Sequence, residues 1–474
     1  MKQIDIEKAN LEHSTRKKKN IVSIEEKREI KGKIKQGSWW YVSEDSGKTA
    51  FVHSTMAEYI IQEYDLVRFP DADGDLYIYN KQSGIYEKDE STRKLRAIIR
   101  NLESTLKNNS VREVRDYIVD MCRVEYQKNK EYIVANNGLV NIKDKSFKPF
   151  TPDIFVTDKI PTNYKPDAYD EFIHQTITKA SCHHQATIEN IKETFAMVLY
   201  PRLIVHKIIY LLGISANNGK STILNAIRAS LDGGGQISAV TPKRLAENSF
   251  AGSSMYGKMA NIVDDLPDEV ITDTGNIKTA VTGGWMEIEE KRQSSRSVQI
   301  QTPFIIASNH TPKFKEHGEQ INKRLHILPF EYNFRADGEH MNEKETLEKI
   351  QSDSAKEYVL KLAVDTLADM LHRPGDAVLT PNERAEEAIK TFDDSSNPLS
   401  AYFEERGEEH FLNTPFNQLY QDYQRWAQLN LESHPVDREN FKTIISNQYN
   451  LMWKRQVRYK INGEWKNRPG FVKN

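Results

Sequence analysis

Four short apolar runs in the middle of the chain predict strands that are buried on both faces of a sheet. They cover residues 208–212 (IIYLL), 259–266 (MANIVDDL), 304–309 (FIIASN) and 325–330 (LHILPF). Continuous rather than alternating apolar residues are typical of strands that helices cover on both sides. Apolar residues at helical spacing precede and follow these runs, so the pattern predicts an α/β fold.

The residues before this region predict a smaller domain of mixed helix and strand, from residue 56 to about residue 150. Ser91 is placed to cap a helix that runs towards Leu106. Residues 132–142 fit two strands around an Asn-Asn-Gly turn. Residues 147–166 are extended and contain several prolines, which is typical of a connector between domains.

The last third of the chain predicts a helix over residues 354–371, a polar linker over residues 393–398, and then a second small domain. Two helices, 415–429 and 437–449, precede a β-hairpin over residues 451–471. From residue 450 to the end there are seven Lys or Arg residues and one acidic residue, Glu464. Interleaved aromatic residues make this stretch a candidate DNA-binding surface, with a solvated basic face on an aromatic hairpin as the alternative. The candidate DNA-binding residues are Lys454, Arg455, Arg458 and Lys460.

Composition narrows the class of protein. The 474 residues suggest two to four domains, and 38% hydrophobic with 28% charged residues is a globular composition. No run of eighteen apolar residues and no apolar N-terminal segment is present, so we expect a cytoplasmic protein without membrane contact. The net charge of −2 means that any nucleic-acid binding must come from local basic patches. One such patch, Arg16 to Lys19, lies in a charge-dense stretch that predicts either a DNA-touching arm or a solvated tail over residues 1–55.

A strand, a turn of small residues and a helix predict a phosphate-binding loop around Lys220. The turn must let backbone N–H groups point at phosphates, and the N-terminus of the following helix adds its dipole. Lys220 would reach the β and γ phosphates of ATP, and the Ser221 hydroxyl would bind Mg²⁺. The pattern departs from G-x-x-x-x-G-K-[ST] at residue 214, which is Ile, and the nearest glycine is Gly213. The predicted nucleotide-binding residues are Gly213, Asn218, Gly219, Lys220, Ser221 and Thr222.

Acidic and polar residues end the next strands, where the second half of a nucleotide-hydrolysing site is expected. Asp264 and Asp265 follow about 45 residues after the loop, and a carboxylate there can hold Mg²⁺ or polarise the attacking water. Asp264 is the predicted Mg²⁺ partner of Ser221. Asn309 can orient water against the γ-phosphate, although Asn is also a common turn residue at a strand end. Residues 285–300 predict a β-hairpin with Lys291 and Arg292 near its tip.

In this order the motifs resemble those of superfamily 3 helicases within the AAA+ ATPases, and above all the poxvirus-type and phage or plasmid primase–helicase group. The resemblance rests on LLGISANNGKSTILNAI, NIVDDL, TGGWMEIEEKRQSS, FIIASNHTP and NKRLHILPF. The segment 132–164 is also similar to the domain that precedes the helicase in that group. The likeness extends to replication initiator helicases of phages and mobile genetic islands, and it covers roughly residues 130–335.

The resemblance implies roles for single residues. Asp264 and Asp265 would be the Walker B acids, although many relatives carry Glu at the second position. Asn309 would be the sensor, Arg324 a finger donated to a neighbouring subunit, and Lys291 the pore-hairpin lysine. Similar phage proteins usually end in a winged-helix domain, which agrees with the basic hairpin at the end of this chain.

These inferences combine into an α/β protein with an AAA+ P-loop core, an N-terminal α+β domain and a C-terminal winged-helix domain. The expected parts are an arm (1–55), the N-terminal domain with its connector (56–166), the core (167–345), a helical segment (346–392) and the winged helix (396–474). The expected function is a ring-shaped, most simply hexameric, ATP-dependent DNA helicase that replicates a phage, plasmid or mobile element, together with host or element-encoded replication proteins. An origin-binding initiator that melts DNA, a primase–helicase, and an AAA+ machine acting on protein are the alternatives.

Overall fold

The structure is a computed structural model, and it divides the chain into two compact units. One unit comprises residues 1–141 and 146–159, and the other comprises residues 142–145 and 160–474. The residues that the structure describes are 34–42, 48–69, 75–200, 202–213, 215–232, 235–266, 270–271, 273–289, 295–311, 313–314, 319–336, 338, 341–374, 379–396, 398–430, 435–461 and 463–473.

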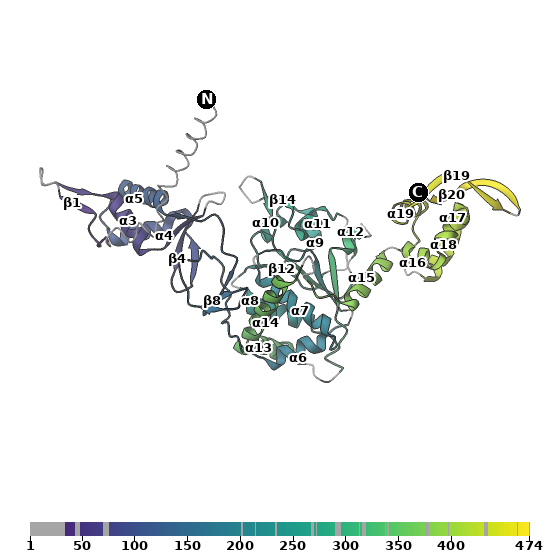
Figure 1. Ribbon diagram of the computed structural model, residues 1–474, viewed down its shortest axis with the longest axis horizontal. Helices are drawn as coiled ribbons and strands as arrows, with labels where there is room; N and C mark the ends of the chain where they lie inside the picture. The colour runs from purple at the N-terminus through teal and green to yellow at the C-terminus, as the bar shows by residue number, and fades with distance from the viewer. Residues whose placement is uncertain are drawn as a thin grey trace, which may run out of the picture. The chain divides into compact units, whose positions relative to one another are not determined.

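The first unit is a mixed α/β domain (Figure 1). Its main sheet has the order β5-β4-β3-β6, in which β6 runs parallel to β3 and the other pairs are antiparallel. A second, antiparallel sheet has the order β7-β8-β9, and its first two strands meet at the predicted Asn-Asn-Gly turn. The elements are β3 (Leu66–Phe69), β4 (Asp75–Asn80), β5 (Ile85–Lys88), β6 (Arg123–Val124), β7 (Tyr132–Ala135), β8 (Gly138–Asn141), β9 (Phe147–Lys148), α3 (His53–Glu63), α4 (Arg93–Leu102) and α5 (Asn108–Met121).

Two predictions for this unit need correction. Trp39 is only 1% exposed and belongs to the core that α3, α4 and α5 build, and β1 (Trp40–Val42) pairs with β2 (Thr49–Phe51). The described residues between 34 and 55 therefore belong to the folded unit and not to an arm, because a buried Trp ties them to it. Residues 1–33 of the predicted arm lie outside the described residues.

The predicted cap of α4 is also wrong. Ser91 has a φ of 54° inside a short 3₁₀ turn (Glu90–Thr92) that precedes the helix. The carboxylate of Asp89 accepts hydrogen bonds from the backbone N–H groups of Lys94 (2.7 Å) and Leu95 (2.8 Å) instead. Two N–H groups near the start of the helix are thereby satisfied by one buried carboxylate.

The core of the second unit is a five-stranded sheet in the order β11-β12-β16-β10-β18, with every neighbouring pair parallel. The four apolar runs are therefore strands, as predicted. Ile208 and Tyr210 face one apolar cluster with the helices of residues 242–281, and the alternate residues Ile209 and Leu211 are buried on the other face. The strands are β10 (Ile208–Leu212), β11 (Ile237–Ser238), β12 (Ala260–Val263), β16 (Phe304–Ser308) and β18 (Leu325–Pro329).

Helices form a layer around α8, the helix that follows β10. Helices α6, α7, α13 and α14 all contact α8, and α14 also packs along α7. The predicted helical segment after residue 345 is thus part of the core. The helices are α6 (Glu171–Ala180), α7 (Gln185–Leu199), α8 (Lys220–Leu231), α9 (Pro242–Glu247), α10 (Ala251–Met255), α11 (Gly275–Val281), α12 (Glu319–Asn322), α13 (Glu343–Ile350) and α14 (Asp353–His372).

The predicted hairpin over residues 285–300 is confirmed. Strands β14 (Trp285–Ile288) and β15 (Arg296–Gln299) pair antiparallel. Its tip, with Lys291 and Arg292, lies outside the described residues. Strands β13 (Val270–Ile271) and β17 (Lys313–Phe314) form a further small parallel pair.

The C-terminal region contains helices and a two-stranded ribbon with their own aromatic core. The predicted polar linker at residues 393–398 is wrong, because α15 continues to Ser396 and α16 begins at Pro398. The two later helices and the hairpin are confirmed. The elements are α15 (Glu383–Ser396), which contacts β18, α16 (Pro398–Arg406), α17 (Glu408–Asn413), α18 (Phe416–Asn430), α19 (Arg438–Gln448), β19 (Leu451–Ile461) and β20 (Glu464–Lys473).

Within the described part of the chain, no helix is both long and apolar enough to cross a membrane.

Candidate nucleotide site

The parallel sheet brings the predicted site residues to one edge. In the sheet register, Leu212 at the end of β10 lies beside Ser308 at the end of β16 and beside Pro329 of β18. Because parallel strands end at the same edge, the loop after Leu212, Asn309 after β16, and Asp264 after β12 meet there. This edge is where ligands bind in open α/β sheets.

Lys220 is the most tightly held residue of the loop. Its ammonium donates hydrogen bonds to the carbonyl oxygen of Gly213 (3.0 Å), to Oδ1 of Asn218 (3.0 Å) and to Oδ1 of Asn309 (3.1 Å). The residue is only 6% exposed, and burial lowers the pKa of the amine, while Asp264 and Asp265 partly oppose this shift. The predicted loop lysine and the predicted sensor are therefore direct neighbours.

The structure explains why the loop has glycine at residue 213, one residue before the position that the usual motif requires. A Cβ atom at Gly213 would lie 2.0 Å from Nδ2 of Asn218 and 2.6 Å from Nζ of Lys220. Only a residue without a side chain lets these groups approach the backbone. Asn217 (φ 59°) and Gly219 (φ 89°) take left-handed conformations in the same turn, which Asn and Gly adopt most readily. Ile214 lies outside the described residues.

The two acidic residues that follow β12, Asp264 and Asp265, have different surroundings. Ser221 Oγ lies 3.4 Å from Oδ1 of Asp264, and Arg228 Nη1 lies 3.9 Å from Oδ2 of the same carboxylate. Asp265 has a left-handed backbone (φ 56°), and the next residue, Leu266, returns to the sheet by donating to Ala307 O at 3.0 Å. Both acids follow Val263, the last residue of β12, and both are exposed.

The oxygen atoms of Ser221 and Asp264 are of the kind that Mg²⁺ prefers. No group of three or more His, Cys, Asp or Glu side chains forms a metal cage in the described ranges. A hydroxyl and one carboxylate fit an ion that takes its remaining ligands from phosphate oxygens and water, as Mg²⁺ usually does.

Arg324 lies at the opposite edge of the sheet. It precedes β18, and the amide N–H of Ile208, the first residue of β10, donates to its carbonyl oxygen at 2.7 Å. Its Nη1 donates to Gln320 O at 2.5 Å, and its buried Nε has no hydrogen-bond partner among the described residues. The five-residue strand β10 separates it from the phosphate loop, about 16 Å at the usual rise per residue. Arg324 cannot act on the loop of its own chain.

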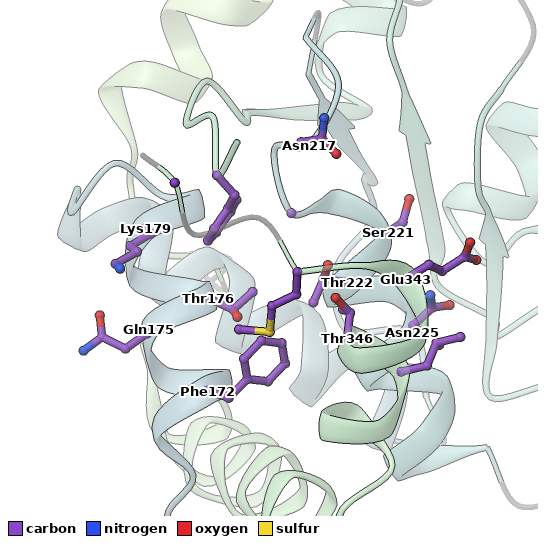
Figure 2. A pocket seen from close by; sticks show the side chains of 15 residues that line it. Phe172, Gln175, Thr176, Lys179, Asn217, Ser221, Thr222, Asn225, Glu343 and Thr346 are labelled. Atoms are coloured by element: carbon purple, nitrogen blue, oxygen red, sulfur yellow. The ribbon is translucent and has the colours of Figure 1, made fainter. Parts of the chain in front are cut away.

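A pocket of about 630 Å³ adjoins the loop (Figure 2). Figure 2 shows α6 side chains such as Gln175 and Lys179 on one side, with Thr346 of α13 and Asn225 of α8 on the other. Thr222 lines it as well, and Phe334, whose N–H donates to Asn217 O at 3.0 Å, lies against Gly219. The lining residues are Phe172, Gln175, Thr176, Lys179, Asn217, Gly219, Ser221, Thr222, Asn225, Phe334, Gly338, Met341, Glu343, Thr346 and Leu347.

Sequence reasoning did not identify the residues that α6, α13 and the segment after β18 contribute to this pocket. They carry no motif, and they meet the loop only because these elements pack on α8. The predicted DNA-binding residues Lys454, Arg455, Arg458 and Lys460 are all exposed on β19.

Two family models match parts of the chain. One, described as D5 N terminal like, matches residues 14–182, and the other, a family of unknown function (DUF5906), matches residues 211–324. No curated protein matches the chain.

Among solved structures, the A-form apo structure of the NrS-1 C-terminal region is similar with a TM-score of 0.54 and 11% identity, over 88% of this chain and 99% of that chain. A second apo structure of the NrS-1 C-terminal region (305–718) is similar with a TM-score of 0.53 and 12% identity, over 88% and 98% of the two chains. At this identity the likeness concerns the fold.

Proposed function

We propose that the protein is an ATP-dependent DNA helicase of superfamily 3 with an AAA+ core, acting in replication of a phage, plasmid or other mobile element. One observation carries the proposal. The Lys220 ammonium lies within hydrogen-bond distance of Asn309, at the sheet edge where Ser221 and Asp264 also meet. Four polar groups from three parallel strand ends thus surround the place where a γ-phosphate and its Mg²⁺ would lie.

Each residue then has a chemical task. Lys220 binds the β and γ phosphates, and the backbone N–H groups at the start of α8 bind them as well. Ser221 and Asp264 would hold Mg²⁺, which neutralises charge on the phosphate oxygens. Asp265 and Asn309 orient the attacking water. The pocket beside Thr222 accepts the nucleoside, because its Phe172, Phe334, Met341 and Leu347 side chains offer apolar cover for a base.

The position of Arg324 supports a ring. An arginine that stabilises the transition state is worth about 10³-fold or more in rate, yet Arg324 lies across the sheet from its own loop. It would therefore complete the site of a neighbouring subunit, most simply in a hexamer. The β14–β15 hairpins would line the central channel, where Lys291 and Arg292 hold single-stranded DNA.

The D5 N-terminal-like match favours a primase–helicase as the second candidate, because it covers the N-terminal unit. Template-dependent primer synthesis by the purified full chain would distinguish this candidate from a helicase that makes no primers.

The decisive experiment for the nucleotide site is Lys220→Ala. We expect the variant to lose ATP hydrolysis while its melting temperature stays within a few degrees of the parent, because the lost charge faces the loop and not the apolar core. Lys344→Ala is the matched control, since that lysine is exposed on α13 and, among the described residues, its one ion pair is a 3.9 Å contact with Glu348. Normal turnover by the Lys220 variant would refute the assignment.

A further inference from the structure

The C-terminal strands form a long antiparallel ribbon whose base is anchored in the aromatic core of the C-terminal helices. β19 has 11 residues and β20 has 10, and Figure 1 shows both as curved arrows that extend beyond the neighbouring helices. Leu451 and Phe471, at the base, are buried in the aromatic core with α18 and α19. On β20, the residues from Glu464 to Arg468 are all exposed. The distal half therefore has no structural role in that core.

A close contact shapes the ribbon between base and tip. The pairing register shifts between Lys454 and Val457, and Tyr459 then packs against the backbone of Gly470. A Cβ atom at Gly470 would lie 1.6 Å from the Tyr459 hydroxyl oxygen, so only glycine fits there. Tyr459 is buried, and burial raises the pKa of its phenol. The irregular pairing and this contact account for the curvature of the ribbon.

Positive charge lies on both faces of the distal ribbon. Residues that pair across the strands share a face, so Lys460 lies with Trp465 on one face, and Val457 lies with Arg468 on the other. Among the described residues, the ribbon carboxylate Glu464 pairs with Lys466 (3.1 Å), and Glu408 pairs with Lys473 (2.9 Å). Five ribbon cations have no carboxylate partner in that part of the chain: Lys454, Arg455, Arg458, Lys460 and Arg468. Arg458 lies over the Trp465 ring, and the other four have no aromatic ring contact among the described residues.

In contrast to the ribbon, helix α19 beside it has cations that contact other groups of the protein. Arg438 of α19 lies over the rings of Phe416 (5.1 Å) and Tyr420 (5.5 Å) and donates to Asn417. Lys442 lies 4.8 Å from the Trp453 ring and forms a 2.6 Å ion pair with Glu439. The cations of α19 are thus engaged within the protein, and the helix has little net charge to offer to phosphate.

We propose that this ribbon, and not α19, is the principal contact with duplex DNA. The major groove of B-DNA, about 12 Å wide, admits a two-stranded β-ribbon. A ribbon with cations on both faces can contact the phosphates of both strands at once, and its curvature lets it follow the groove. Trp465, 59% exposed and 5.3 Å from the Arg458 guanidinium, lies near the tip, where it can contact base edges. This inference rests on the proposed function for its DNA partner.

The test is the salt dependence of duplex binding by the full chain. A ribbon variant (K454Q, R455Q, K460Q, R468Q) and the parent are titrated with a labelled 30-base-pair duplex at several salt concentrations. Each lost phosphate contact lowers the slope of log K against log salt by about 0.9, so we expect a reduction of about 3 to 4. Thermal melting checks that each variant is folded.

Two further variants make the result specific. A matched charge control replaces four exposed lysines elsewhere by Gln, and it should keep the parental slope; these are Lys81, Lys107, Lys344 and Lys390. The α19 variant (R438Q, K442Q) should change duplex affinity by less than about threefold. An unchanged slope in the ribbon variant, a larger loss in the α19 variant, or a loss confined to single-stranded DNA would overturn the inference.

The experiments test the ribbon contact and the nucleotide site independently. If the parent hydrolyses ATP but binds no duplex, the proposed ribbon contact is refuted, while the assignment of the nucleotide site is not affected. If Lys220→Ala hydrolyses ATP normally, the proposed function falls, whatever the ribbon variant does.

Discussion

At the scale of single residues, Gly213 shows how the predicted phosphate loop can position Lys220 although its glycine lies one residue earlier than the usual motif requires. The carbonyl oxygen of Gly213 accepts a hydrogen bond from Lys220, and the missing side chain leaves room for Asn218. Asn218 in turn donates to Ser215 O at 2.5 Å and accepts from Lys220, so one side chain ties the turn to the ammonium. The glycine is required by contact and not by a left-handed backbone.

We therefore predict that Gly213→Ala keeps the fold but lowers kcat/KM for ATP by about 10²-fold, because the new methyl displaces the Lys220 ammonium. Steady-state ATP hydrolysis measures the loss. Gly275→Ala at the start of α11 is the control, since a Cβ there meets only the Asp273 carboxylate at 3.2 Å. Equal kinetics for both alanine variants would contradict this account of the loop.

At the scale of elements, a buried polar network joins α7, β18 and the connection from α14 to α15. Asn190 of α7 accepts from Asn382 Nδ2 at 2.8 Å, and its Oδ1 also lies 3.1 Å from His326 Nε2. Glu193 is fully buried and accepts from the N–H of Thr380 (2.9 Å) and from the Arg373 guanidinium. Such a network is costly when any member loses its partner.

His326 makes this network sensitive to acid. Burial, with a smaller contribution from Lys207, lowers the pKa of His326 to about 4 from its ordinary 6.5. The unfolded chain therefore binds the proton more readily than the folded one, so stability falls as the pH decreases from 6.5 towards 4.

We expect this single group to remove up to about 3 kcal/mol of the free energy of unfolding over that range. Denaturant unfolding of the parent and of His326→Gln, at several pH values between 7 and 4, isolates the contribution, because other titrating groups are common to both proteins. The parent should lose more stability than the variant on acidification. Parallel pH profiles would show that His326 is not held neutral by the fold.

At the scale of the whole molecule, the proposed ring depends on residues at two edges of one sheet. Lys220 follows the carboxyl end of β10. Arg324 lies at the opposite edge of the sheet, directly before Leu325, the first residue of β18. One subunit can thus supply a phosphate loop at one surface and an arginine at another, as an assembly with sites between subunits requires.

We predict that Arg324→Ala binds ATP with nearly parental affinity but loses cooperative hydrolysis. Mixing it with Lys220→Ala should restore part of the ATPase activity, because one kind of mixed interface joins an intact loop to an intact arginine. Nucleotide titration and ATPase assays of the mixture measure both effects. Absence of recovery, with co-assembly shown by a tagged pull-down, would argue against an arginine that acts between subunits.

Much of the local structure followed from the sequence, because local rules decide it. The apolar runs predicted β10, β12, β16 and β18, since four or five consecutive apolar residues need cover on both faces. Local sequence patterns also predicted the turn around Gly219, the β14–β15 hairpin and the last two helices. Predictions failed where a distant group competed with the local pattern. At the start of α4, Asp89 and not Ser91 accepts the hydrogen bonds of the backbone N–H groups. Helix α15 continues to Ser396, inside the expected linker.

The sequence by itself thus determined the order of strand, loop and helix around Lys220, and it named the residues that we propose bind phosphate and Mg²⁺. Only the tertiary structure decided which of them meet. Lys220 and Asn309 are 89 residues apart in sequence, and they touch because β10 and β16 pair in one parallel register. The pocket beside the loop likewise requires α6 and α13 to pack on α8. Such contacts depend on the register and packing of distant segments, which no local pattern of residues encodes.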